Sequence, residues 1–183
     1  IYTRGLLGLH APLIEVEVHV SQGLPSLTIV GLAEAAVRES KDRVRSAIIN
    51  SGFQFPTKRL TINLAPADLP KDGSRLDLPI ALGILMASGQ IPEHATDQLE
   101  FIGELALDGQ LRPITGILSI AIACQQSGHQ LILPEQNAPE ASQLPQFEVF
   151  AAQHLKDVCE HLSKQQPIAQ YQPQTTTTVD QYK

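Results

Sequence analysis

The chain is poor in the residues that build disulfide frameworks, metal centres and membrane spans. Its 183 residues include no tryptophan, one methionine and two cysteines, Cys124 and Cys159. Two cysteines are too few for a disulfide framework or a structural zinc site, so we expect a reducing, cytoplasmic compartment. No apolar run approaches the roughly 20 residues that cross a bilayer. The first residues also lack the basic and apolar segments of a secretion signal, and we expect no membrane partner.

Motifs for phosphate or metal binding are missing as well. No G-x-x-x-x-G-K-[ST] loop occurs, so we expect no ATP site within these residues. The six histidines show no metal-ligand spacing except for His154 and His161, which are seven residues apart near the end of the chain. Two helical turns would separate them, and a surface pair is a simpler interpretation than a site. We therefore expect no cofactor and no metal in this chain.

Charge is unevenly distributed along the chain. The net charge is −6, which argues against a nucleic-acid-binding surface that covers the whole domain. Eight of the thirteen basic residues nevertheless lie between positions 38 and 75: Arg38, Lys41, Arg43, Arg45, Lys58, Arg59, Lys71 and Arg75. Only four acidic residues oppose them in that window. These basic residues form either one basic face or a solvated helix together with scattered charges in loops.

Hydrophobic periodicity predicts an α/β domain over residues 1–163. Strands are expected at 14–20, 27–30, 58–65, 101–105, 110–112, 130–133 and 148–151, and helices at 32–51, 77–88, 115–126 and 153–163. The first two strands resemble a hairpin closed by Gly23-Leu24-Pro25. From Lys164 the composition shifts to Gln, Pro and Thr, which predicts a flexible linker over 164–183 that leads to a further module.

Two motifs about thirty residues apart carry a family resemblance. Pro70–Leu82 and Gly103–Gly116 resemble the proteolytic domain of Lon-type proteases. Further stretches in the same order (Pro25–Leu32, Glu39–Ala47 and Ile62–Asp68) are more similar to non-peptidase relatives of that domain. These relatives are the C-terminal domain of RadA and, with the strongest match, the N-terminal domain of the YifB/ComM family of magnesium-chelatase-like AAA+ ATPases. The resemblance covers nearly the whole chain.

The resemblance implies both a fold and a setting. The fold would be Lon protease-like, or ribosomal-protein domain-2-like, with a mixed sheet and packed helices. A downstream AAA+ module would bind ATP and Mg, assemble into ring-shaped hexamers, and act on DNA as a helicase in branch migration during natural transformation. The expected partners are therefore other copies of the protein, the ATPase module and DNA.

The catalytic positions of the peptidases hold other chemistry in this chain. A Ser-Lys dyad needs a hydroxyl and a lysine whose amine is neutral. Aligning the first motif places Asp77 where the peptidases have the serine, and the second places Leu118 where they have the lysine. We expect Asp77 to cap the helix that follows it. The resemblance therefore predicts a domain without peptidase activity.

Two alternatives stay open from the sequence. Ser74, or less plausibly Ser119, is a shifted nucleophile with Lys71 nearby, although Lys71 is expected in an exposed loop where its amine is protonated. The domain is otherwise a plain protein-interaction module. In the main interpretation the candidate contacts to DNA or to the ATPase module are Arg38, Lys41, Arg43 and Arg45, three of which (38, 41 and 45) are at helical spacing.

Overall fold

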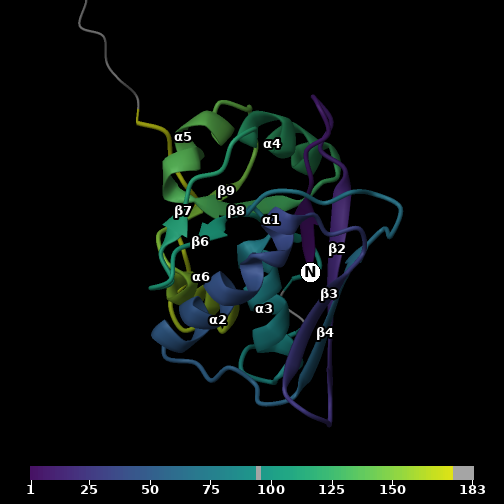
Figure 1. The fold of residues 1–183 in the computed structure, drawn as a ribbon. Helices are drawn as coiled ribbons and strands as arrows, with labels where there is room; N and C mark the ends of the chain where they lie inside the picture. Colours follow the sequence, from purple (N-terminus) through teal and green to yellow (C-terminus); the bar gives the residue numbers. More distant parts are fainter. Residues whose placement is uncertain (94–95, 175–183) are drawn as a thin grey trace, which may run out of the picture.

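The computed structural model describes residues 1–93 and 96–174, which form a mixed sheet with helices packed on it (Figure 1). The strands are β1 (Tyr2–Arg4), β2 (Leu13–Ser21), β3 (Ser26–Val30), β4 (Arg59–Ala65), β5 (Leu99–Phe101), β8 (Gln130–Pro134) and β9 (Val149–Ala152), in the spatial order β3-β4-β2-β1-β5-β8-β9. A separate pair consists of β6 (Glu104–Leu105) and β7 (Leu111–Arg112). The predicted α/β class is confirmed.

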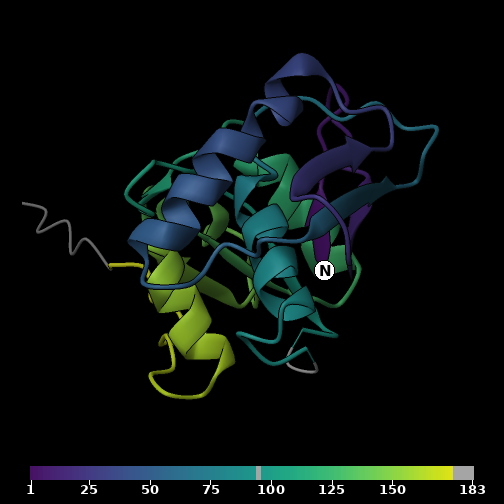
Figure 2. The same ribbon diagram turned by 60° about the horizontal axis from the view of Figure 1, so that its bottom comes forward.

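The helices are short to medium in length. They are α1 (Ala35–Arg38), α2 (Ser40–Asn50), α3 (Asp77–Ala87), α4 (Ile117–Gln126), a 3₁₀ turn η1 (Glu135–Asn137), α5 (Ala138–Ala141) and α6 (Leu155–Leu162). Figure 2 shows α2 and α3 lying side by side, with α6 near the end of α2. Within the described residues no helix is long and apolar enough to cross a membrane.

The half of the sheet formed by β2, β4 and β3 has one covered face and one open face. β2 runs antiparallel to β4, and β3 runs parallel to β4. Alternate residues such as Val16 and Ile62 are buried against α2 and α3, while the intervening Glu17 and His19 are exposed. Figure 1 shows no helix on the outer side of these strands. This alternation is typical of an antiparallel sheet with one solvated face.

The other half, formed by β5, β8 and β9, is parallel and covered on both faces. In β8, Ile132 belongs to the core beneath α2, α3 and α6, whereas Leu131 and Leu133 belong to a second core beneath α4 and α5. All three side chains are at most 1% exposed. Their continuous apolar run follows from burial on both faces, as parallel strands require.

Three predictions about strands were wrong. The hairpin is absent because β4 pairs with both β2 and β3 and separates them. The strand predicted at 101–105 is split between β5 and β6. The chain leaves the large sheet at Gly103, whose N–H donates to the carbonyl of Arg75 and whose own carbonyl accepts from Leu78. The prediction also missed β1, since three residues are too short to show a period.

The helix predicted at 32–51 begins later and is interrupted. Leu32 has a positive φ of 55°, which a right-handed helix does not allow. α1 ends at Arg38 and α2 begins at Ser40, with Glu39 between them at φ −66° and ψ −17°. Glu39 is therefore a turn residue between two separate helices and not part of one continuous helix.

Residues 164–174, the described part of the predicted linker, contain no helix or strand and contact the domain. Ile168 and Tyr171 pack against the first and second cores respectively. The amide of Tyr171 donates to the carbonyl of Val149 in β9 at 2.7 Å. The rest of the predicted linker, 175–183, lies outside the described residues.

Candidate functional site

The residue expected at the position of the nucleophile, Asp77, is the centre of a buried hydrogen-bonded cluster. Its carboxylate accepts from the Ser40 hydroxyl at 2.5 Å, from Arg43 Nε at 2.7 Å and Nη2 at 3.1 Å, and from the Leu105 amide at 3.1 Å. The Asp77 side chain is fully buried, and that of Arg43 is 22% exposed. These four residues, the Asp77 cluster, join α2, α3 and β6.

The surroundings of Asp77 set its chemistry. Burial raises the pKa of the Asp77 carboxyl, while the hydrogen bonds from Arg43, Ser40 and the Leu105 amide oppose that rise. The hydrogen bond between Arg43 and Asp77 also raises the pKa of the Arg43 guanidinium. Asp77 is the first residue of α3, and its side chain bonds to other elements instead of the helix. The expectation that it caps α3 was therefore wrong, because α2 and β6 supply stronger partners.

The candidate for a shifted nucleophile, Ser74, is bound to an acid. Its hydroxyl donates to Glu104 Oε2 at 2.5 Å. The next residue, Arg75, donates from Nη1 to the carbonyl of Thr115 at 3.1 Å, in the segment that leads into α4. A carboxylate at this distance can orient a serine hydroxyl. A Ser-Lys dyad would instead need an amine bonded to that hydroxyl, and the Lys71 amine donates to two carbonyl oxygens.

Lys71 is the clearest correction to the sequence analysis. It was expected in an exposed loop, but only 1% of its surface is exposed. Its Nζ donates to the carbonyl oxygens of Gly31 (2.6 Å) and Pro66, and among the described residues it bonds to no hydroxyl. Burial lowers the pKa of this amine. The loop is buried because the backbone of Lys71 pairs with Leu32 and Glu34.

The position expected for the base carries no titratable group. Leu118 is the second residue of α4, and its side chain is partly exposed. Ser119 follows it and is half-buried. The helix places a hydrocarbon at this position, next to Ile117, which anchors α4 in the second core.

The four basic candidates on α1 and α2 differ in what they contact. Arg43 is engaged with Asp77, as described above. Arg38 and Arg45 are exposed, and Lys41 is half-buried. Arg38 Nε donates to the carbonyl of Ala33 at 3.0 Å, and the Arg45 guanidinium lies 5.6 Å from the centroid of the Phe55 ring. The charges available on this face are therefore those of Arg38, Lys41 and Arg45.

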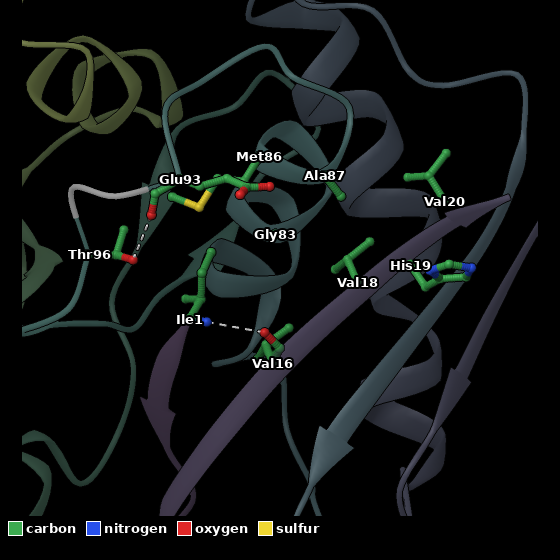
Figure 3. A pocket seen from close by; sticks show the side chains of 10 residues that line it. All are labelled: Ile1, Val16, Val18, His19, Val20, Gly83, Met86, Ala87, Glu93 and Thr96. Atoms are coloured by element: carbon green, nitrogen blue, oxygen red, sulfur yellow. Dashed lines mark hydrogen bonds between the residues drawn. The ribbon is translucent and has the colours of Figure 1, made fainter.

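The hollow of about 400 Å³ in Figure 3 lies between β2 and α3. Valine side chains of β2 and Met86 supply much of its wall, and Gly83 allows close contact, since a Cβ there would meet Val18 at 2.7 Å. Its polar groups include His19, Glu93 and Thr96, and His19 lies apart from the other two in the view of Figure 3. These groups do not converge on one point, so we assign no catalytic role to the hollow.

Histidines 154 and 161 do not act as a pair. His154 is the N-cap of α6, with Nδ1 accepting from the Lys156 amide at 3.1 Å. His161 Nδ1 accepts from the Ile168 amide at 2.8 Å. Within residues 1–93 and 96–174, no three His, Cys, Asp or Glu side chains are grouped in a way that could hold a metal ion.

Sequence reasoning missed a buried ionic cluster on the other side of the sheet. Glu100 in β5 is fully buried and binds Arg4 through two hydrogen bonds of 2.7 and 2.9 Å, and His129 Nδ1 lies 2.8 Å from Glu100 Oε2. Arg4 also donates to Ser127. A charged residue in the middle of an apolar strand was the signal that could have indicated it.

The comparisons with known proteins agree with the resemblance seen in the sequence. A family model described as subunit ChlI of Mg-chelatase matches residues 16–137. Competence protein ComM of Haemophilus influenzae is 49% identical over 92% of this chain, and YifB of Escherichia coli is 48% identical over 94% of it. The Lon protease of Chloroflexus aurantiacus is 31% identical over 73% of it.

The matched parts are small fractions of these relatives. The chain spans about a third of the length of ComM and of YifB, and 17% of that Lon protease. The model match over most of the chain, together with nearly half of the residues identical to ComM and YifB, assigns the chain to the YifB/ComM family of magnesium-chelatase-like proteins, with Lon proteases as more distant relatives.

Proposed function

We propose that this domain is a non-catalytic module of a YifB/ComM-type AAA+ ATPase. It supports assembly of an ATPase ring and the processing of DNA by that ring, as a helicase in branch migration. ATP and Mg are bound by the rest of the protein, since the chain has no phosphate-binding loop of the G-x-x-x-x-G-K-[ST] type. The ComM relative carries the name of a competence protein, which supports a role in DNA uptake.

The Asp77 cluster is the observation that carries the non-catalytic part of the proposal. A nucleophile must present a reactive oxygen to a substrate, whereas the Asp77 carboxylate is fully buried and bonded to three residues. The same cluster fixes α2 on α3 through the Arg43–Asp77 pair. The residue at the position of the peptidase nucleophile therefore has a structural role: it holds α2, which carries basic side chains, against α3.

That basic face is the proposed contact to DNA. Arg38 at the end of α1 and Lys41 and Arg45 in α2 recur at intervals of three and four residues. Exposed Glu39 and Asp42 dilute the charge within one domain. In a ring of several copies, the contacts to phosphates add up, so binding by the ring should be strong and salt-dependent while binding by one domain is weak.

The test is charge reversal in the full-length ring. Arg38→Glu, Lys41→Glu and Arg45→Glu together should weaken DNA binding and lower the slope of log K against log salt by about 0.9 for each lost phosphate contact. A matched control reverses three exposed cations elsewhere, Arg112, Lys156 and Lys164, and should leave the slope unchanged. An unaltered slope in the first variant rejects the DNA contact. Loss of ring assembly instead, seen by light scattering, assigns the face to protein contacts.

A peptidase is the second candidate, because Lys71 is buried and burial lowers the pKa of its amine, which is the direction that a catalytic lysine requires. Against it, the amine donates to two carbonyls and Ser74 is bonded to Glu104. Incubation with a fluorophosphonate probe should leave the chain unlabelled. Labelling that Ser74→Ala abolishes would establish the peptidase and overturn the non-catalytic proposal.

A further inference from the structure

We propose that residues 164–174 form a docked strap along the β9 edge of the sheet, held by His161, Ile168 and Tyr171, and that acid releases it. The strap follows α6 and appears in Figure 1 as the yellow segment that runs from α6 past β9. This inference is independent of the proposed function. It concerns how the chain leaves the folded domain.

Four contacts define the path of the strap. The amides of Gln165 and Gln166 both donate to the carbonyl of Glu160 and turn the chain back after α6. The Ile168 amide donates to His161 Nδ1 at 2.8 Å, and its side chain packs on the first core. The Tyr171 amide donates to Val149 in β9 at 2.7 Å, while its side chain packs on the second core.

These contacts pair the strap with the β9 edge of the sheet. β9 is the last strand, and one of its outward carbonyls is paired with the strap. Unpaired edge strands tend to pair with other chains, and a covering segment is one of the ways in which proteins prevent this. The strap therefore both orients the chain after α6 and pairs one carbonyl of this edge strand.

His161 makes the docking depend on pH. Its Nδ1 accepts a hydrogen bond, and an imidazole nitrogen that carries a proton cannot accept one. The ring also lies against Phe150, with ring centroids 5.6 Å apart. Burial lowers the pKa of the His161 imidazole below its usual 6.5, and we attribute part of this burial to the strap, whose Ile168 amide bonds to the ring.

The charged groups near His161 come from α6 and η1. Asp157 and Glu160 on α6 and Glu135 on η1 line a hollow of about 220 Å³ beside Gln166, Pro167 and Ile168. Burial sets the direction of the pKa shift of His161. The facing groups on β9 and on the strap, Phe150 and Ile168, are uncharged.

The sign of the pH effect follows from proton binding. The docked state has the lower His161 pKa, so it binds fewer protons than the released state. Docking is at full strength above about pH 6.5, weakens as the pH falls through that value, and levels off below the pKa of the docked ring. At pH 5 the weakening is at most about 30-fold, the ratio of protonated to neutral imidazole 1.5 units below 6.5.

The experiment measures hydrogen exchange at the Ile168 and Tyr171 amides of the 183-residue chain at pH 7.5 and pH 5, corrected for the intrinsic pH dependence. The wild-type protection factor should fall at pH 5, by up to about 30-fold. His161→Asn keeps an acceptor near the Nδ1 position without titrating, and should make protection equal at both values. His161→Ala removes the acceptor, and should abolish the protection at both pH 7.5 and pH 5.

A matched control uses the other capping histidine. His154→Asn changes a ring that bonds to the Lys156 amide and to the carbonyl of Asp108, neither of which belongs to the strap, so it should leave the pH response of Ile168 unchanged. If wild-type protection does not change with pH, or if His161→Asn responds to pH as the wild type does, the proposal is overturned.

A second measurement does not require a variant of the histidine itself. Ile168→Ser weakens the strap at a partly buried site, and should raise the pKa of His161 toward 6.5 in an NMR titration because the ring loses its cover. A His161 titration identical to that of the wild type would show that the strap does not bury the ring, and would reject the proposal.

Discussion

The two halves of the sheet bury their residues differently. In the antiparallel half, β2 and β4 alternate between buried and exposed residues, and one face meets solvent. In the parallel half, β5 and β8 are buried at nearly every position by α2, α3 and α6 on one face and by α4 and α5 on the other. Substitutions that leave the free energy of unfolding nearly unchanged are therefore expected at many positions of the antiparallel half and at very few of the parallel half.

The contrast is greatest for glutamate. Glu17 on β2 is exposed, and its Oε2 accepts a hydrogen bond of 3.3 Å from Asn63 Nδ2. Glu100 on β5 is fully buried, with its charge compensated by Arg4 and with His129 Nδ1 2.8 Å from its Oε2. Water can replace lost partners on the open face, but nothing replaces them between two layers of helices. The loss in the free energy of unfolding caused by a substitution should therefore depend more on the half of the sheet than on the type of residue replaced.

The largest difference is expected between these two glutamates. Glu100→Ala leaves the Arg4 charge buried without its partner, and should lower the free energy of unfolding by about 3–5 kcal/mol. Glu17→Ala should change it by less than about 0.5 kcal/mol. Urea denaturation of both variants provides the comparison. Equal losses would mean that the open face is covered in solution.

Aliphatic residues should show a smaller version of the same contrast. Ile132→Ala in β8 removes a fully buried side chain and should cost about 2–5 kcal/mol. Val30→Ala in β3 acts on a residue that is 42% exposed on the open face, and should cost about 0.5 kcal/mol. The same denaturation measurement applies. A cost above about 2 kcal/mol at Val30 would contradict the open-face assignment.

The smallest effect is expected from a thiol of the covered half. Burial raises the pKa of Cys159 to about 12 from 9.0, so above pH 9 the unfolded chain loses this proton while the folded one keeps it. Stability should therefore fall as the pH rises, by about 1.4 kcal/mol per unit between pH 9 and pH 12.

The measurement compares the free energy of unfolding at pH 8 and pH 10 in the wild type and in Cys159→Ala. The variant is less stable throughout because it loses packing in the core, but its decline between the two values should be shallower by about 1.4 kcal/mol. Parallel declines would show that the Cys159 thiol ionises as readily in the folded chain as in the unfolded one.

Much of the fold could be predicted because local patterns carried it. The alternation from Ile14 to Val20 and from Leu60 to Leu64 marked β2 and β4, and α3 begins at Asp77 where its motif placed it. Predictions failed where pairing joined distant residues. The hairpin failed for this reason, because nothing near Gly23 shows that residues 59–65 will insert between the first two long strands.

The candidate site was predicted less well, because its chemistry depends on partners far along the chain. Asp77 was expected to cap a helix, but Ser40 and Arg43, 37 and 34 residues away, bind it instead. Lys71 was expected in solvent, but the loop that contains it pairs with residues 32–34. Composition alone gave no sign of either contact.

The sequence by itself determined the family, the α/β class and the positions of the long strands and helices, because motif order and hydrophobic period are local properties of the chain. The tertiary structure alone decided which charges are buried, which basic side chains remain available and where residues 164–174 are held. Burial and hydrogen bonding depend on what packs from distant parts of the chain, and the free energy of a charge changes several-fold between water and a core.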